Sequence, residues 1–101
     1  MAKILVVDTK EICKYTKLYL TKRKHQVITT NTSKGAIAAI KSKRPQIILF
    51  EKNLPDLDGI KLLEQVRQLN PSIKAVMITA TRLDQEDRQQ WKIYILSSPL
   101  I

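Results

Sequence analysis

Polar side chains that could do chemistry stand where the apolar runs of this 101-residue sequence end. Carboxylates bind hard cations such as Mg²⁺ when a few of them are well placed, and hydroxyls and amides donate hydrogen bonds to anionic groups. The residues in these positions are Asp8 and Thr9, Glu51 and Asn53, Thr79, and Ser98. Because such groups act only when the fold brings them together, the elements that carry them decide which chemistry is available.

Several kinds of catalytic site lack the residues that they need. The only glycines are Gly35 and Gly59, so the sequence holds no glycine-rich loop that could cradle a phosphate. One cysteine, Cys13, and one histidine, His25, cannot assemble a structural zinc site, and the sequence shows no pairing of a nucleophile with its base. We therefore expect no enzymatic activity of the chain's own and no cofactor.

Apolar runs predict strands, and periodic apolar residues between them predict helices. The predicted strands are residues 3–7, 27–30, 46–51, 74–79 and 92–96. The predicted helices run from Glu11 to about Lys24, from a cap among Asn31, Thr32 and Ser33 to Pro45, from Ile60 to Asn70, and from Leu83 to Gln90. This alternation predicts an α/β fold with a doubly wound, five-stranded parallel sheet. In such a sheet the functional loops gather at the carboxyl ends of the strands, where the polar residues named above stand.

The spacing of the apolar residues also predicts which faces are buried. In the first helix, the residues expected to pack on the sheet are Ile12, Tyr15, Tyr19 and Leu20. In the third helix, the expected buried stripe is Ile60, Leu63, Val66 and Leu69. Residues 3–7 read as a strand buried on both faces, and residues 46–51, the most hydrophobic run, as the central strand.

Three segments carry a recognisable combination of motifs, which are Ile4-Leu5-Val6-Val7-Asp8, Asn53-Leu54-Pro55-Asp56-Leu57-Asp58-Gly59 and Met77-Ile78-Thr79-Ala80. In this order and on these elements they resemble the receiver domain of two-component response regulators. They are similar, respectively, to its opening strand and acid, the segment around its phosphorylated aspartate, and its hydroxyl-bearing strand. The resemblance implies a flavodoxin-like receiver fold, with residues 1–101 as a single receiver-like domain in phosphorelay signal transduction.

The resemblance assigns a role to each polar residue at the strand ends. Glu51 takes the position of the phosphoacceptor aspartate, and Thr9 that of the second of two acids that help to hold a magnesium ion. Asp8 keeps the first acid position, and Thr79 keeps the hydroxyl that contacts the phosphoryl group. Ser98 stands where the family has a lysine that pairs with that group. The receiver-pocket equivalents are therefore Asp8, Thr9, Asn53, Thr79 and Ser98.

A glutamate at position 51 changes what this site can do. Its carboxylate is one methylene further from the backbone than that of aspartate, and in-line phosphoryl transfer depends on position. We expect Glu51 not to be phosphorylated, and no metal site beyond weak magnesium binding at Asp8 and Glu51. Two interpretations of Glu51 stay open: it imitates a phosphorylated aspartate by projecting charge toward Thr79, or it is a relic without a signalling role. Phosphorylation at Glu51, Asp56 or Asp58 is the contrary hypothesis.

Two differences in shape follow from the same resemblance. Thr79 and Ser98 are closer together in the sequence than their counterparts in the family, which implies a shortened fourth helix. The sequence stops at Ile101, so the family's fifth helix is expected to be absent. Its absence would leave apolar surface of the sheet and of the first helix bare, and a second copy of the chain or a helix from a partner is the expected cover.

The positive charge of the chain lies in its first half. Residues 1–44 carry a net charge of +9 and residues 45–101 a net charge of zero. Lys10, Lys14, Lys17 and Lys24 recur at helical spacing and predict a basic docking face on the first helix for an acidic protein partner. A solvated helix face without binding is the alternative interpretation, and a nucleic-acid backbone is the alternative partner.

Two hypotheses about function follow from these observations. The first is an atypical receiver domain that signals through protein–protein contact, independently of phosphorylation. The second is a basic nucleic-acid-associated protein on a receiver scaffold, with binding that weakens as salt rises. No apolar run approaches the length of a membrane span or of a signal-peptide core, so we expect a cytoplasmic chain without membrane contact.

Overall fold

The computed structural model describes residues 1–79 and 94–97, with side chains described up to residue 78. Its elements in chain order are β1 (Lys3–Val7), α1 (Lys10–Lys22), β2 (Gln26–Thr30), α2 (Ser33–Lys43), β3 (Ile47–Glu51), α3 (Gly59–Leu69), β4 (Lys74–Thr79) and β5 (Tyr94–Ser97). The predicted short helix over Leu83–Gln90 and the predicted absence of a fifth helix after Ser98 lie outside the described residues.

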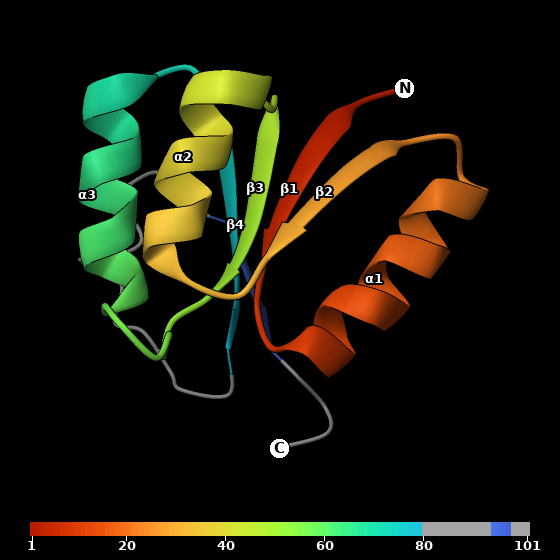
Figure 1. Ribbon diagram of the computed structural model, residues 1–101, viewed down its shortest axis with the longest axis horizontal. Coiled ribbons are helices and arrows are strands. Elements are labelled where there is room, and N and C mark those ends of the chain that lie inside the picture. The colour runs from red at the N-terminus through yellow and green to blue at the C-terminus, as the bar shows by residue number, and fades with distance from the viewer. Residues whose placement is uncertain (80–93, 98–101) are drawn as a thin grey trace.

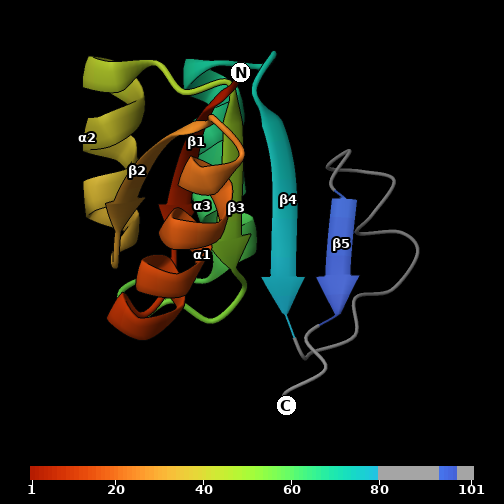
Figure 2. The ribbon, with the colours of Figure 1, turned by 90° about the vertical axis from the view of Figure 1, so that its right-hand side faces the viewer.

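The strands pair in parallel in the order β2-β1-β3-β4-β5 (Figures 1 and 2). β3 lies in the middle, as its apolar sequence predicts. The chain winds outward from β1 to β2, returns past β1 to β3, and then winds the other way, so the predicted doubly wound α/β fold is confirmed. The reversal lies between β1 and β3, and ligands of such sheets bind in the crevice outside the carboxyl ends of the strands at that point.

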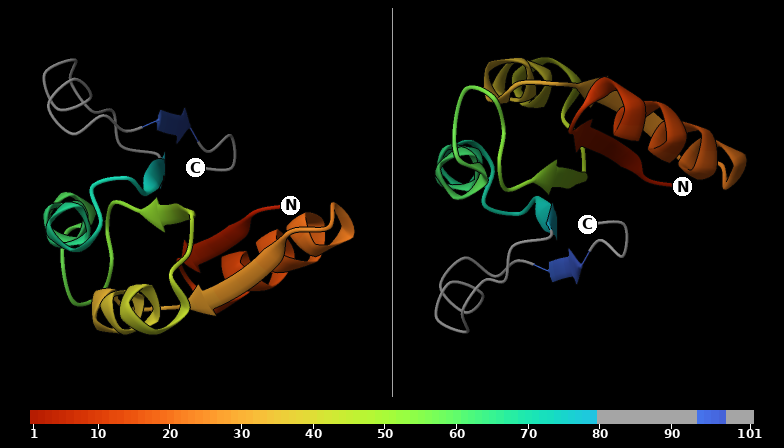
Figure 3. Two further views of the ribbon diagram at one scale, coloured as in Figure 1. Left: turned by 90° about the horizontal axis from the view of Figure 1, so that it is seen from above. Right: turned by 90° about the horizontal axis from the view of Figure 1, so that it is seen from below.

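Helices α2 and α3 cover one face of the sheet, and α1 lies on the other (Figures 1 and 3). The larger core lies under α2 and α3 and includes Leu5, Phe50, Leu63 and Met77, each no more than 1% exposed. β1 is buried on both faces from Ile4 to Val7, as its unbroken apolar run predicts. Burial of this kind, worth about 25 cal/mol for each Å² of apolar surface, supplies most of the favourable free energy of folding.

The predicted buried stripe of α3 is correct in part. Leu63 and Val66 are buried together with Leu62, whereas Leu69 is 44% exposed and Ile60 is half-buried. Leu69 is the last residue of the helix, and the chain turns away toward β4 at Asn70. The contact stripe of α3 is therefore rotated toward Leu62, and a terminal leucine stays in solvent.

The predicted buried face of α1 is wrong for three of its four residues. Ile12, Tyr15 and Tyr19 are 38%, 60% and 56% exposed, and Cys13 is the buried residue of this helix. The face toward the sheet instead follows Cys13, Thr16 and Leu20, which recur at helical spacing. Cys13 is enclosed by the backbone oxygens of Val6, Asp8 and Thr30, which lie 3.5 to 3.7 Å from its Sγ and compete for the single thiol proton. Only a narrow stripe of α1 therefore contacts the sheet.

Helix α1 also ends earlier than predicted. Its last helical residue is Lys22, and Lys24 has a φ of 71°, in the left-handed region. The N–H groups of Arg23 and Lys24 donate to the carbonyls of Leu20 and Thr21, which closes the helix before the chain turns into β2. Lys24 is consequently outside the helix and beyond the row formed by Lys10, Lys14 and Lys17.

On the α1 side, the sheet beyond β1 is only partly covered. Ile47, Leu49, Val76 and Ile78 point to this side and are half-buried, whereas their neighbours Ile48, Phe50, Ala75 and Met77 are buried on the other side. Figure 2 looks at this side and shows no described helix over β4 and β5. The two faces of the sheet therefore differ in how completely the described helices cover them.

Candidate functional site

The parallel register brings the predicted site residues to one edge of the sheet. Val7 pairs with Phe50, so Asp8 and Glu51 are the next residues on adjacent strands. Glu51 pairs with Ile78 of β4. Thr79, the residue after Ile78, pairs with Ser97 of β5. The sequence prediction of a shared edge is thus correct for the backbone of these residues, while Ser98 lies outside the described residues.

Asp8 has an enclosed carboxylate. Only 8% of the residue is exposed, and the backbone N–H of Thr9 donates to its Oδ1 at 2.7 Å. Burial raises the pKa of the Asp8 carboxyl above its ordinary value, and the hydrogen bond from Thr9 offsets part of that rise. The side chain of Asn31 donates to the Asp8 backbone carbonyl at 2.8 Å and fixes the turn after β1.

Thr9 caps helix α1. It has extended backbone angles, and its hydroxyl accepts a hydrogen bond from the N–H of Ile12 at 3.3 Å. Threonine is a favoured residue at this position because its oxygen satisfies an N–H that the helix leaves unpaired. The position where the family has its second acid therefore holds a helix cap with no charge.

The Glu51 side chain turns toward its own loop. Its Oε1 accepts a hydrogen bond from the backbone N–H of Asn53 at 3.4 Å, and the residue is half-buried. Asn53 itself is exposed and forms an isolated antiparallel bridge with Asp58. Within residues 1–78, no group of three or more histidine, cysteine, aspartate or glutamate side chains could hold a metal ion.

The loop after β3 is held by Lys52, Asp58 and Gly59. The Lys52 ammonium lies 3.3 Å from Asp58 Oδ2, while Asp58 Oδ1 accepts from the N–H of Ile60 at 2.8 Å and caps α3. Gly59 is buried, and a Cβ there would lie 2.7 Å from the carbonyl oxygen of Glu51. The glycine therefore lets the start of α3 approach the end of β3 closely enough to form this loop.

Asp56 binds the start of α2, a contact that sequence reasoning missed. Its carboxylate accepts hydrogen bonds from the N–H of Ser33 at 2.9 Å, the hydroxyl of Ser33 at 2.8 Å and the N–H of Lys34 at 3.2 Å. The two bonds from Ser33 lower the pKa of the Asp56 carboxyl below its ordinary value. A local motif could not reveal a contact across 23 positions, although a carboxylate is favoured at a helix N-terminus.

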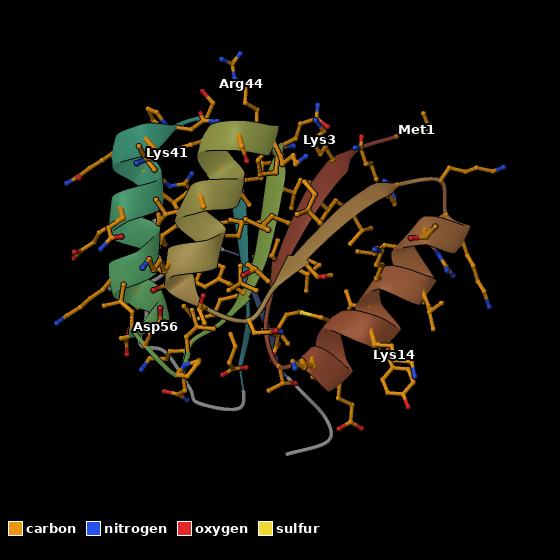
Figure 4. All side chains as sticks on the ribbon, in the orientation of Figure 1. Met1, Lys3, Lys14, Lys41, Arg44 and Asp56 are labelled. Carbon is orange, nitrogen blue, oxygen red and sulfur yellow. The ribbon has the colours of Figure 1, made fainter. Side chains whose placement is uncertain are left out.

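The lysines of the predicted docking face are partly brought together. Lys10, Lys14 and Lys17 are exposed on α1, and Figure 4 shows Lys14 pointing into solvent. Lys24 is exposed beyond the end of the helix. Ile12, Tyr15, Leu18 and Tyr19 occupy another exposed part of the same helix, and Arg23 stacks on the Tyr19 ring with its guanidinium 3.6 Å from the ring centre.

Comparison with known proteins gives a consistent result. The sequence matches the family described as the response regulator receiver domain over residues 4–94. The transcriptional regulatory protein KdpE of Mycobacterium tuberculosis is 32% identical over 91 residues, which cover 89% of this chain and 39% of KdpE. The alkaline phosphatase synthesis regulator PhoP of Bacillus subtilis is 34% identical over 79 residues, which cover 77% of this chain and 33% of PhoP. The chain thus spans about a third to two fifths of these relatives.

A solved structure extends the comparison to the fold. The crystal structure of a two-component response regulator from Clostridium difficile superposes with a TM-score of 0.89 at 26% identity, covering 100% of this chain and 86% of that one.

In the described part of the chain, no helix is both long enough and apolar enough to cross a membrane.

Proposed function

Because the chain belongs to the response regulator receiver domain family, we propose that it is an atypical receiver domain that signals through protein–protein contact without being phosphorylated. The observation that carries this proposal is a pair of differences from the family at the edge where the carboxyl ends of the strands meet, which we call the carboxyl edge. Glu51 stands at the phosphoacceptor position with its carboxylate turned toward Asn53, and Thr9 is engaged as the cap of α1. We propose no catalytic activity of the chain's own.

The chemistry of the edge supports this proposal. In-line phosphoryl transfer requires the attacking oxygen and the metal in fixed positions, and Mg²⁺ prefers near-ideal octahedral oxygen geometry. The carboxylates of Asp8 and Glu51 remain near that point, while Thr9 supplies a neutral hydroxyl where the family has a second acid. The longer Glu51 side chain cannot place its oxygens where an aspartate would. A metal-assisted transfer to Glu51 is therefore disfavoured by both charge and position.

Asp56 and Asp58 are poor alternative acceptors for a different reason. Both oxygens of Asp56 accept hydrogen bonds from the start of α2, and both oxygens of Asp58 are used by Lys52 and the N–H of Ile60. A carboxylate must give up such partners to attack a phosphoryl group, which weakens it as a nucleophile. The hypothesis of phosphorylation in this loop thus has no support in the geometry of either side chain.

The exposed side of α1 is the contact surface that we propose. Ile12, Tyr15, Leu18 and Tyr19 are between 38% and 60% exposed there. Aromatic side chains are enriched in the cores of protein interfaces, and contiguous apolar patches often mark association sites. A second copy of this chain is the proposed occupant, since a twofold pairing covers the same patch on both copies.

Intact-mass spectrometry after incubation with acetyl phosphate and Mg²⁺ tests the absence of phosphorylation. We expect the wild-type mass to be unchanged. The matched control is the variant T9D/E51D/S98K, which restores the three family residues and is expected to gain one phosphoryl group. A phosphoryl group on wild-type Glu51, Asp56 or Asp58 would contradict the proposal.

The role of the Glu51 charge needs a separate comparison. If Glu51 imitates a phosphorylated aspartate, E51Q removes the imitated charge and weakens self-association or partner binding several-fold. If Glu51 is a relic, E51Q binds as the wild type does. In both cases E51Q should keep the wild-type melting temperature, because the hydrogen bond from Asn53 can be accepted by the amide oxygen.

A further inference from the structure

Most acidic side chains of the described residues lie at one edge of the sheet, whereas basic side chains lie at both edges, with Lys10, Lys34 and Lys52 on the side of the carboxylates. The carboxylates of Asp8, Glu51, Asp56 and Asp58 stand at or near the carboxyl edge. The opposite, amino edge joins the starts of the strands to the ends of the helices, and it carries Lys3, Lys22, Arg23, Lys24, Lys41, Lys43, Arg44 and Lys74. Figure 4 shows Lys3, Lys41 and Arg44 at one end of the molecule and Asp56 at the other.

The amino edge is hollowed by two adjoining depressions of about 480 and 580 Å³. Both are lined by Met1, Ala2, Arg44 and Gln46. Their ionisable side chains are those of Lys3, Lys24, His25, Arg44 and Lys74, and no acidic residue within the described part of the chain lines either depression. Among the residues that the structure describes, the amino edge is thus a concave surface of a single sign of charge.

Backbone contacts hold this surface in place. Gln46 makes two hydrogen bonds with Lys3: its side-chain oxygen accepts from the Lys3 N–H, and its backbone N–H donates to the Lys3 carbonyl. The backbone carbonyl of Gln46 also accepts a hydrogen bond from the N–H of Lys74. These bonds of 2.8 to 3.1 Å fix the starts of β1 and β4 relative to each other. Arg44, with a φ of 51°, closes α2 by donating its N–H to the Ile40 carbonyl. The cations are therefore presented from a rigid base.

Most of these cations have no partner within the described protein. The Lys3 ammonium donates to the Lys43 carbonyl at 2.8 Å, but the side chains of Lys24, Arg44 and Lys74 make no hydrogen bond or ion pair within residues 1–78. The helix ends at this edge cannot neutralise them, because each helix C-terminus carries only about half a negative charge. A ligand with several negative charges is the counterpart that such a surface lacks.

We propose that the amino edge binds the phosphate backbone of a nucleic acid, independently of the signalling role proposed above. The cations follow consecutive strands, from Lys24 before β2, through Lys3 on β1 and Arg44 before β3, to Lys74 on β4. At a strand spacing of about 4.8 Å, this row spans about 14 Å. A row of this length matches an extended polyanion, whereas a single small anion would need cations that converge on one point.

The lining favours a nucleic acid over an acidic peptide. Among residues 1–78, no tyrosine, tryptophan or phenylalanine lines either depression, although peptide interfaces commonly use such residues as anchors. The same absence removes base stacking, so contacts are made to phosphates and carry no base specificity. Binding of this kind is electrostatic, and its affinity falls steeply as the salt concentration rises.

Fluorescence anisotropy with a short labelled DNA duplex of mixed sequence, titrated with the full chain, tests the proposal. The edge variant K24Q/R44Q/K74Q removes three charges whose side chains support no described contact. The matched control K10Q/K14Q/K17Q removes three charges from α1. We expect the edge variant to bind about tenfold or more weakly than the wild type, with a salt slope smaller by about one for each lost phosphate contact, and the control to lose less than threefold.

Four results would overturn the proposal. The first is that the wild type does not bind DNA at about 50 mM salt, and the second is that the two variants lose equal DNA affinity. The third is that poly-glutamate binds the amino edge more tightly than DNA does. The fourth is that inorganic phosphate displaces DNA at an equal phosphate concentration. The third would assign the edge to an acidic protein and the fourth to a small anion. Thermal melts by circular dichroism of both variants ensure that a loss of binding is not a loss of fold.

Discussion

The Asp56 carboxylate accepts hydrogen bonds from both the backbone N–H and the hydroxyl of Ser33, at 2.9 and 2.8 Å, and so joins the loop after β3 to the start of α2. This loop follows Glu51 directly, and α2 follows β2 on the other side of β1. Asp56 thus connects the loop of the candidate site to α2, a helix that is distant from this loop in the sequence.

Replacing Asp56 by alanine should lower the melting temperature by a few degrees at pH 7. The pKa of Asp56 is lowered in the folded protein, so its contribution to stability is complete above the ordinary value of 3.8 and is lost as the pH falls through the lower folded value. Melts of D56A and wild type should therefore converge in acid. E64A, at an exposed position of α3, is the control, and a difference between D56A and wild type that persists in strong acid would argue against the contact.

The D8N substitution should raise the melting temperature at pH 7. Because burial raises the pKa of Asp8 in the folded protein, the folded state binds the proton more tightly than the unfolded state does. The folded state therefore loses stability as the pH rises from the ordinary pKa of 3.8 through the higher folded pKa. Asparagine carries no charge and keeps an oxygen for the Thr9 N–H. The gain should disappear below the ordinary pKa of 3.8. A lower melting temperature of D8N at pH 7 would show that the charged form is the stabilised one.

The G59A substitution should destabilise the protein by about 1–3 kcal/mol, a typical cost of overpacking. The added Cβ would meet backbone atoms, at 2.7 Å from the Glu51 oxygen and 2.8 Å from the Lys52 Cα, and backbone atoms cannot rotate away. Q68A, at an exposed position of the same helix, is the control, because it changes a side chain that faces solvent. Urea unfolding should give Q68A a cost below about 1 kcal/mol. Equal costs would mean that the approach of α3 to β3 is not fixed by Gly59.

The variant Y15S/Y19S should reduce self-association measured by sedimentation velocity. The two tyrosines are 60% and 56% exposed on α1, and burying such side chains on association is favourable. We expect the wild type to sediment as a dimer at micromolar concentration and Y15S/Y19S as a monomer. L69S replaces a 44% exposed leucine on α3 and should leave the dimer unchanged. A wild type that stays monomeric would refute the second copy as the occupant of this surface.

Local patterns in the sequence predict the strands well and the exposed side of α1 poorly. β1 and β3 are found because each is an apolar run that the helices bury, a property of the run itself. Tyr15 and Tyr19 recur at helical spacing, but whether they are buried depends on which neighbours lie beside α1, and spacing carries no such information. The turn at Lys24 was missed because a lysine with positive φ leaves no signal in its residue type.

The candidate site also has features that the sequence predicts and features that it does not. Parallel strands must end at one edge, so the order of elements was sufficient to place Asp8 beside Glu51. The contact of Asp56 with Ser33 depends on the packing of two helices on one face of the sheet, which is a tertiary property. The role of Thr9 as a cap is a local property, because threonine directly before a helix is a favoured cap residue.

A residue-resolved NMR titration tests the central claim most directly. Mg²⁺ and then beryllofluoride, a mimic of a bound phosphoryl group, are added while the amides of Asp8, Thr9, Glu51, Asn53 and Thr79 are followed. We expect no saturable shift at these amides at ordinary magnesium concentrations, and clear saturable shifts in the T9D/E51D/S98K variant. Saturable shifts confined to these amides in the wild type, at ordinary magnesium concentrations, would show that the carboxyl edge still senses a phosphoryl group and would contradict a phosphorylation-independent receiver domain.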